Sequence, residues 1–294
     1  MKFRGYETFS IRNGWLCKGL QKIKENPYFF TDKTIDQTVE LGIGSNMVKA
    51  IRYYLTATGL TDEKRGQGIT ATKFGDLIFE YDKYLQKTGT LILLHYNLAI
   101  NKDNATSWYF FFNEYSAVEI NKNSFLLQIR DFIKQNGENE IAERSLRDDY
   151  DCIIKTYLPR NKKESFEDNL QCPLSDLGLL INGNKKLNID ARKTSINIEN
   201  VPEEIALYII KKNNKENQNE IKISHIEKGI GSLGKTLNLS ITETSEILEK
   251  LENDRKIKIT RTAGIETIRF LNEAIQKDCD DYLNEYYKKQ VRNE

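Results

Sequence analysis

The sequence has 294 residues, of which 39% are hydrophobic and 30% are charged, and its 44 basic and 43 acidic side chains leave a net charge of +1. This length predicts two or three small domains or one large one. The balanced charge does not by itself indicate a nucleic-acid partner. A local excess, 6 basic against 2 acidic side chains in residues 1–30, is compatible with contact to phosphate.

Several kinds of site are excluded by what the sequence lacks. Its four cysteines form no CxxC pair and it has two histidines, so a zinc ribbon or a multi-histidine metal centre is not expected. No P-loop or GxSxG motif is present. With no apolar run near 18 residues and no visible signal peptide, we expect a cytoplasmic protein without a membrane partner.

The first part of the chain has the pattern of a winged helix-turn-helix. Asp32 or Thr34 can cap a first helix, because their side-chain oxygens accept bonds from its free N–H groups. Gly42 and Gly44 bracket a tight turn, where glycine adopts positive φ at little cost. Ser45 is then expected to cap a second helix that is apolar on its inner face.

The outer face of that second helix and the loop after it carry the side chains expected to contact DNA. In a winged helix the second helix enters the major groove and the wing meets the backbone. Asparagine and arginine read base edges, whereas lysine, threonine and tyrosine hold phosphates. The expected contacts are Ser45, Asn46, Lys49, Arg52, Tyr53, Lys64 and Arg65. The same pattern also fits a helix-turn-helix that packs against protein.

A similar pattern recurs at the other end of the chain, where it predicts a second winged helix followed by a polar helix or a frayed tail. The third helix of this unit is expected to expose Glu243, Glu246 and Glu249, which would repel phosphate. Any DNA contact is therefore expected from the wing, through Lys256, Lys258 and Arg261. A protein-contact or spacing role is the alternative.

Together these patterns predict a mainly α, α+β protein. Winged-helix units at residues 1–90 and 200–294 are expected to surround a mainly helical, aromatic-rich central domain at residues 91–199. His95 lies between leucines and a tyrosine, so we expect a buried structural histidine rather than a general base.

The central region also contains the acidic side chains that could support nuclease chemistry. A metal-dependent nuclease needs carboxylates that converge on Mg²⁺ or Mn²⁺, which activates water and stabilises the leaving oxygen. The candidates are Asp148, Asp149, Asp151, Glu167 and Asp168. Carboxylates near helix starts also serve the helix dipole and solubility, so an ordinary surface role stays open.

Six stretches, in order, resemble one bacterial family of formerly unknown function encoded beside DNA phosphorothioation genes. Its expected pattern is a G-H-E-T-F opening followed by LGVG, LLHY and S-PL-LGLI blocks. The matching stretches are FRGYETFSIRNGWLCKGL, LGIGSNMVKAIRYYLTATGL, LILLHYNLA, TSWYFFFNEY, SLRDDYDCIIKTYLP and EDNLQCPLSDLGLL.

The resemblance implies a function that the patterns alone do not. The family resembles the SspB-type DNA-nicking subunit of a single-strand phosphorothioation system. It therefore implies binding of double-stranded DNA in antiphage defence, with ATPase and sulfur-transferase subunits as partners and nicking as a possible activity. A winged-helix transcription regulator and a protein-interaction scaffold are the alternatives.

One position departs from the family pattern. Tyr6 stands where the pattern has histidine, which puts in doubt any chemistry that this histidine performs. If the histidine is structural, tyrosine can keep one of its hydrogen bonds. Glu7 and Arg12 match the pattern, and we expect them to form a buried ion pair.

Overall fold

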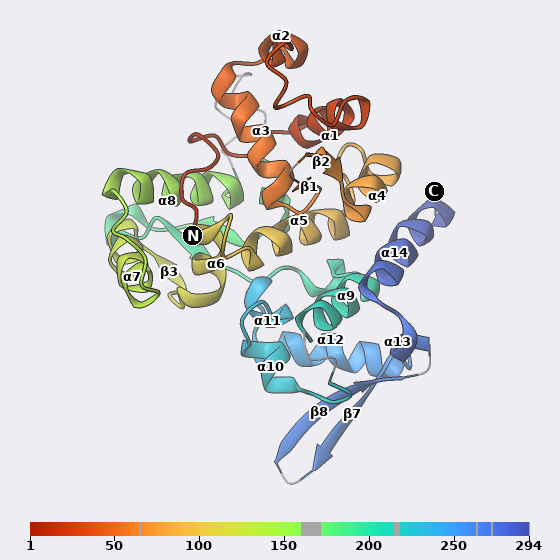
Figure 1. The fold of residues 1–294 in the computed structure, drawn as a ribbon. Helices are drawn as coiled ribbons and strands as arrows, with labels where there is room; N and C mark the ends of the chain where they lie inside the picture. Colours follow the sequence, from red (N-terminus) through yellow and green to blue (C-terminus); the bar gives the residue numbers. More distant parts are fainter. Residues whose placement is uncertain (65, 160–171, 215–217, 263, 272, 294) are drawn as a thin grey trace. The chain divides into compact units, whose positions relative to one another are not determined.

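The computed structural model describes residues 1–64, 66–159, 172–214, 218–262, 264–271 and 273–293. Over these ranges the chain is mainly helical and its short strands form three small antiparallel sheets, which confirms the α+β class. The chain divides into two compact units, Met1–Lys193 and Thr194–Glu294 (Figure 1). The three-part division at residues 90 and 199 stays a prediction, and its first two parts fall almost wholly within the first unit.

The first unit begins with two helices, a tight turn, a longer helix and a β-hairpin. Val48, Ile51 and Leu55 are buried along one side of the longer helix, as predicted. A Cβ on Gly19 would lie 2.7 Å from Ile51 and Leu55, so the close approach of the first helix requires glycine there. The elements are α1 (Trp15–Glu25), α2 (Gln37–Leu41), α3 (Ser45–Ala57), β1 (Thr61–Lys64), β2 (Gly68–Ala71) and α4 (Lys73–Tyr81).

The caps of α2 and α3 differ from the predictions. Asp36 caps α2 by accepting bonds from two of its backbone N–H groups. Asp32 instead accepts from the backbone and hydroxyl of Thr34, which closes a local turn and delays the start of the helix. Gly44 is the residue before α3, and Ser45 is its first helical residue without a capping bond.

An aromatic core fills the rest of the first unit. Trp108, Phe111, Phe125 and Tyr157 are each no more than 1% exposed. His95 is fully buried with its Nδ1 2.7 Å from the Tyr157 hydroxyl, which confirms the expected structural histidine. The helices are α5 (Thr88–Ile100), α6 (Thr106–Tyr109), η1 (Phe110–Glu114), α7 (Lys122–Gln135), α8 (Glu143–Tyr157), η2 (Pro173–Leu177) and η3 (Lys185–Leu187). The strands, in sheet order β3-β5-β4, are β3 (Glu119–Ile120), β5 (Ala191–Lys193) and β4 (Leu180–Asn182).

The second unit places several helices against one three-stranded sheet of order β6-β8-β7. Figure 1 shows the β7–β8 hairpin extending beyond α10 and α12. This order of elements is the one predicted, and the winged-helix assignment of both units stays a prediction. The elements are η4 (Ile198–Asn200), α9 (Glu203–Asn213), β6 (Ile221–Lys222), α10 (Ile223–Lys228), α11 (Leu233–Thr236), α12 (Ile241–Asn253), β7 (Ile257–Thr262), β8 (Ile265–Phe270), α13 (Glu273–Gln276) and α14 (Cys279–Asn293).

The chain's last helix, α14, is part of the core of this unit. Tyr282, Leu283, Tyr286 and Tyr287 are each no more than 2% exposed, and the helix packs against α9. These positions repeat at a spacing of four and one, which buries one face of a helix. The expected helix is therefore confirmed, but it is neither polar on all sides nor frayed, because this spacing hides an aromatic stripe in a charged sequence. Across the described ranges, no helix combines the length and apolar character needed to span a membrane.

Candidate functional site

The amino-terminal half of α3 presents polar side chains to solvent directly after the glycine turn. Gly42 has φ 66°, a left-handed conformation that favours glycine. Ser45, Asn46 and Lys49 are exposed, and we call these three residues the α3 face. The opposite side of the helix is held by buried apolar residues, so the position of the α3 face is set by the core.

Tyr53 does not lie on this surface, and the prediction of an exposed Tyr53 is wrong. Its side chain is 7% exposed, and its hydroxyl donates to the backbone carbonyl of Asn104 at 2.9 Å. The segment before α1 covers its ring so closely that a Cβ on Gly5 would lie 2.5 Å away. Helical periodicity does not reveal this burial, because the covering residues lie far away in sequence.

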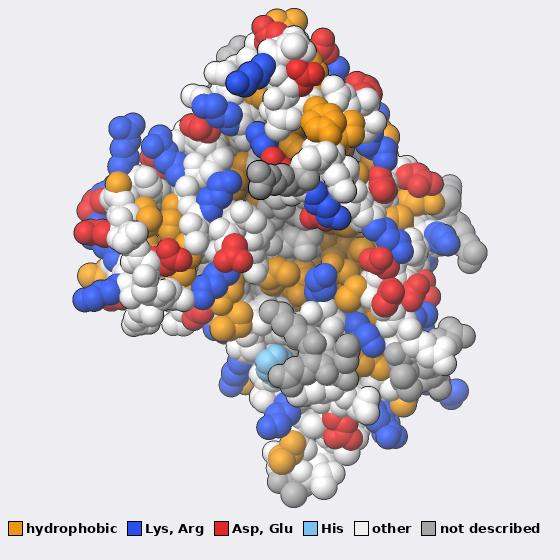
Figure 2. Space-filling model, viewed as in Figure 1, with side chains coloured by type: hydrophobic (Ala, Val, Ile, Leu, Met, Phe, Trp, Pro, Cys, Tyr) orange, Lys and Arg blue, Asp and Glu red, His pale blue; other side chains and the backbone are white. Residues whose placement is uncertain are grey.

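The two cations predicted on α3 both have carboxylate partners. Lys49 Nζ lies 3.5 Å from Glu7, and Arg52 lies 2.5 Å from Glu63 of β1. All four side chains are at least 37% exposed. Exposed ion pairs contribute little to stability, so either cation can exchange its carboxylate for a phosphate. Figure 2 shows the same intermixing of basic and acidic side chains over the visible face of the first unit.

The expected buried pair of Glu7 and Arg12 is wrong. Glu7 faces Lys49, whereas the Arg12 guanidinium lies over the rings of Phe9 and Trp15, at 5.8 and 5.4 Å from their centroids. A guanidinium is weakly hydrated and stacks readily on aromatic rings, which explains this placement.

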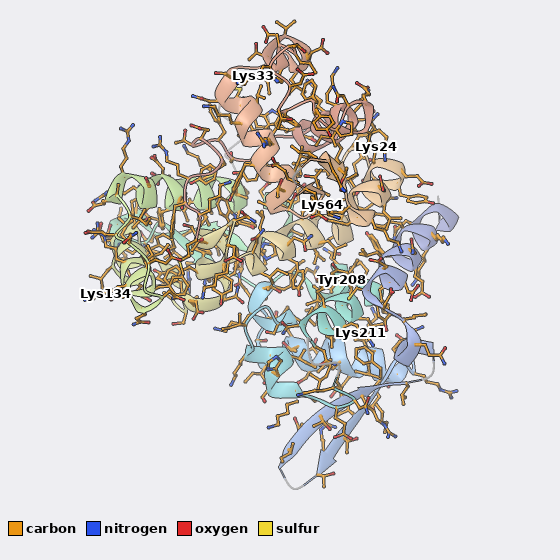
Figure 3. The ribbon with its side chains drawn as sticks, in the orientation of Figure 1. Lys24, Lys33, Lys64, Lys134, Tyr208 and Lys211 are labelled. Atoms are coloured by element: carbon orange, nitrogen blue, oxygen red, sulfur yellow. The ribbon has the colours of Figure 1, made fainter. Side chains whose placement is uncertain are left out.

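The hairpin after α3 carries the other two predicted contacts of the first unit. Lys64, labelled in Figure 3, ends β1 and is exposed. Arg65 lies outside the described residues. The Tyr28 hydroxyl donates to the carbonyl of Gly66 at 2.9 Å, so the connection between α1 and α2 holds the tip of the hairpin.

A second candidate site forms where the segment before α1 meets α3, α6 and α8. The backbone N–H of Lys2 donates to Thr106 of α6, at 2.9 Å. Arg4, Glu7 and Thr8 have φ of 54°, 52° and 75°. Such conformations cost about 1–3 kcal/mol each in non-glycine residues and persist where surrounding contacts determine them. The segment is therefore held in a fixed and strained path.

Asp149 of α8 is the acceptor that holds this segment. Its carboxylate is 1% exposed and accepts from the hydroxyls of Tyr6 and Ser107 and from the backbone N–H of Arg4. Burial raises the pKa of Asp149 to about 6, while the three donors act in the opposite direction. Since its acceptor positions face these donors, we interpret Asp149 as a structural anchor.

Tyr6 is a structural partner of Asp149 and is poorly placed for chemistry. It is fully buried among the rings of Tyr53, Tyr54 and Trp108. Burial raises its pKa far above that of a free phenol. A tyrosine nucleophile needs access to its phosphate and a base that removes its proton. Tyrosine at this position thus keeps one hydrogen bond, as expected if the residue of the family pattern is structural.

The three aspartates of α8 do not converge on one point. Successive helix residues are rotated by about 100°, so neighbouring side chains point in different directions. Asp148 lies 3.0 Å from Arg4 Nε, and Asp151 lies 2.6 Å from Lys122. In the part of the chain that the structure describes, no three His, Cys, Asp or Glu side chains are arranged to hold a metal ion. The remaining predicted carboxylates, Glu167 and Asp168, lie outside that part.

The predicted basic residues of the second unit differ in their exposure and in the carboxylates near them. Lys258 is exposed and lies 3.0 Å from Glu252 of α12. Arg261 lies 2.9 Å from Glu266 and 3.9 Å from Glu249, so two carboxylates surround it. Lys256 is half-buried just before β7. Of the predicted carboxylates on α12, Glu243 is used in a capping box and accepts from Ser195.

A family model with the description "Protein of unknown function (DUF4007)" matches residues 3–287. The chain belongs to the DUF4007 family. It is also similar to two solved structures. One, "SspB crystal structure", is 26% identical with a TM-score of 0.83, over 98% of this chain and 88% of the other. The second, "Magnesium ion-bound SspB crystal structure", is 23% identical with a TM-score of 0.81, over 100% and 97%. No curated protein matches.

The family resemblance inferred from the sequence blocks is thus confirmed, and the DUF4007 opening motif can be placed in the fold. Sequence reasoning named Tyr6 and Asp149 separately but missed that they bond to each other. It also missed Arg4 and Ser107, although both belong to blocks that carried the resemblance.

Proposed function

We propose that this DUF4007 chain is the DNA-binding subunit of a bacterial DNA phosphorothioation and antiphage defence system. The observation that carries the proposal is the α3 face, an exposed Ser45–Asn46–Lys49 surface held rigidly after a tight turn. The similarity to SspB structures supports the choice of system. Family membership alone assigns no activity, since the family is described by its unknown function.

In the proposed complex the α3 face enters the major groove of duplex DNA. Asn46 carries an amide that can bond to a base edge, and Ser45 and Lys49 can bond to phosphates. The tip of the β1–β2 hairpin, with Lys64, takes the position of the wing and contacts the DNA backbone. Arg52 contributes after release from Glu63.

Sulfur chemistry belongs to partner subunits in this proposal. Burial raises the pKa of the Cys17, Cys152 and Cys279 thiols, and Cys172 is buried. A reactive cysteine has the opposite properties, since the thiolate is the nucleophile. We therefore expect the ATPase and the sulfur transferase of the system to be separate proteins that bind this chain.

Metal-dependent nicking is the more demanding part of the expected function. The engaged positions of Asp148, Asp149 and Asp151 favour DNA binding as the primary role of this chain. If the chain nicks DNA with Mg²⁺ or Mn²⁺, the predicted ligands left to test are Glu167 and Asp168. Conversion of supercoiled plasmid to open circle, with an EDTA control, measures this activity directly.

The alternatives make different predictions. A transcription regulator binds DNA without cleaving it and commonly dimerises on a palindromic site. The aromatic stripe of α14 is buried within its own unit, so it is not free to form a dimer interface. A protein-interaction scaffold would have no salt-dependent affinity for DNA, because that dependence arises from released counterions.

The test of DNA binding is fluorescence anisotropy of a labelled duplex of about 25 base pairs, measured over a series of salt concentrations. We expect the double variant Asn46→Ala, Lys49→Ala to lose most of the affinity of the wild-type chain. Lys134→Ala, which removes an exposed lysine from the end of α7, is the matched control and should bind normally. Equal affinity of the double variant and the control would remove α3 from the interface.

A further inference from the structure

The two faces of the β7–β8 hairpin differ in their chemistry. Strand pairing places Ile257 opposite Phe270, Ile259 opposite Ile268 and Arg261 opposite Glu266. The four apolar members of these pairs are buried, and α12 packs against β7. Side chains alternate across a strand, so the intervening residues lie on the opposite face of the hairpin from these buried side chains. We call these intervening residues the outer hairpin face: Lys258, Thr260, Thr262, Ile265, Thr267 and Arg269.

The outer hairpin face is basic and hydroxyl-rich, and none of its six residues carries a carboxylate. Lys258 lies opposite Arg269, and Thr260 lies opposite Thr267, so cations and hydroxyls stand in adjacent rows. Lys258, Thr260 and Arg269 are exposed. Lysine, arginine and threonine side chains are donors that commonly hold DNA phosphates.

Arg269 and Arg261 are a natural comparison because they project from opposite faces of the same hairpin. Arg261 lies near Glu249 and Glu266, which offset its charge. Arg269 forms no ion pair with another residue whose side chain the structure describes. Its guanidinium is therefore the better placed to bind an anion, although only Arg261 stood out in the sequence.

The edge of the hairpin is poorly suited to pairing with a strand of another protein, whereas its outer face suits phosphate. β7 lies at the edge of its sheet, where an added strand would need free backbone groups. The Ile259 N–H is already bonded to Glu252, at 2.9 Å. The same carboxylate lies 3.0 Å from Lys258, an exposed pair that phosphate can replace.

We infer that the outer hairpin face, through Arg269 and Lys258, is a second contact surface for the phosphate backbone of duplex DNA. This inference rests on the proposed DNA-binding function and extends it to the second unit. The threonine hydroxyls donate additional bonds to phosphate oxygens. Arg261 takes no part, because it lies on the opposite face of the hairpin, where two carboxylates offset its charge.

The experiment compares Arg269→Ala with Arg261→Ala in the full chain, again by anisotropy over a salt series. A lost phosphate contact reduces the slope of log affinity against log salt by about 1. We expect this change for Arg269→Ala, together with a roughly 3- to 10-fold loss of affinity at low salt. Arg261→Ala should retain affinity within about twofold. Circular dichroism melting of both variants checks that they remain folded.

Three outcomes would overturn the inference, and they are distinguishable. If Arg261→Ala weakens binding as much as Arg269→Ala, the face assignment is wrong. Normal DNA binding by Arg269→Ala combined with weak binding by the α3 variant would support the proposed function but exclude the hairpin from the DNA interface. Failure of the wild-type chain to bind any duplex would overturn both.

Discussion

The hydroxyl of Tyr6 donates a hydrogen bond to the carboxylate of Asp149, a residue 143 positions further along the chain. This bond joins the opening motif of the family to helix α8. Together with the Arg4 N–H bond to the same carboxylate, it fixes the segment that covers Tyr53 of α3. The packing behind the α3 face therefore depends on a contact between the opening motif and α8.

Removal of the Tyr6 hydroxyl should destabilise the protein. Tyr6→Phe leaves Asp149 without one of its three donors in a buried site, which we expect to lower the free energy of unfolding by about 1–3 kcal/mol. Urea unfolding measures this change. Tyr84→Phe, at a side chain that is 65% exposed, is the control and should unfold like the wild type. Equal stability of the two variants would show that the bond is not important.

Gly5 should tolerate no larger residue. Its Cβ would lie 2.5 Å from the ring of Tyr53, so Gly5→Ala must displace the segment or the ring. We expect a loss of about 1–3 kcal/mol in unfolding free energy, as is typical of overpacking. Gly44→Ala is a matched control, because a Cβ there meets nothing within 4 Å and φ is −67°. A stable Gly5→Ala variant would contradict the tight packing of the opening motif.

Asp149 should make stability depend on pH in a definite direction. Its native pKa of about 6 lies above its ordinary value of 3.8, so between these values the native state binds more protons than the unfolded state. The stabilisation that results from this raised pKa is fully present below about pH 4 and is lost as pH rises through 6. It amounts to at most about 3 kcal/mol of unfolding free energy.

The measurement for Asp149 is the difference in unfolding free energy between wild type and Asp149→Asn, from pH 7.5 to 5. Other carboxylates titrate alike in both proteins, so the difference isolates this group. We expect the wild type to gain stability relative to the variant as pH falls through 6. A difference that does not change with pH would mean that the carboxylate keeps an ordinary pKa.

The stripe of α14 should be essential to the second unit. Tyr287 is fully buried, and its truncation to alanine should cost about 3–5 kcal/mol, as for other large aromatic core residues. Thermal melting of the full chain should show a lower transition temperature. Lys288→Ala changes the next, exposed residue and should melt normally. Indistinguishable melting of the two variants would indicate that α14 is frayed, as its charged composition suggests, and does not stabilise the unit.

Local patterns in the sequence determined the elements and their order. Helical periodicity predicted the buried Val48, Ile51 and Leu55, and strand alternation predicted the β7–β8 hairpin. These predictions succeed because a side chain's face follows from residues three or four positions away in a helix and two away in a strand. The ordered motif blocks identified the family, since the match runs through residues 3–287.

Tertiary structure decided what the candidate functional residues are free to do. It buried Tyr53 beneath Gly5, turned Asp149 into an anchor for Tyr6, and gave Arg261 two carboxylate neighbours while leaving Arg269 on the other face. The first two depend on contacts between residues far apart in sequence. Burial, charge neighbours and pKa arise from what surrounds a side chain in space, and helical or strand periodicity carries no record of those surroundings.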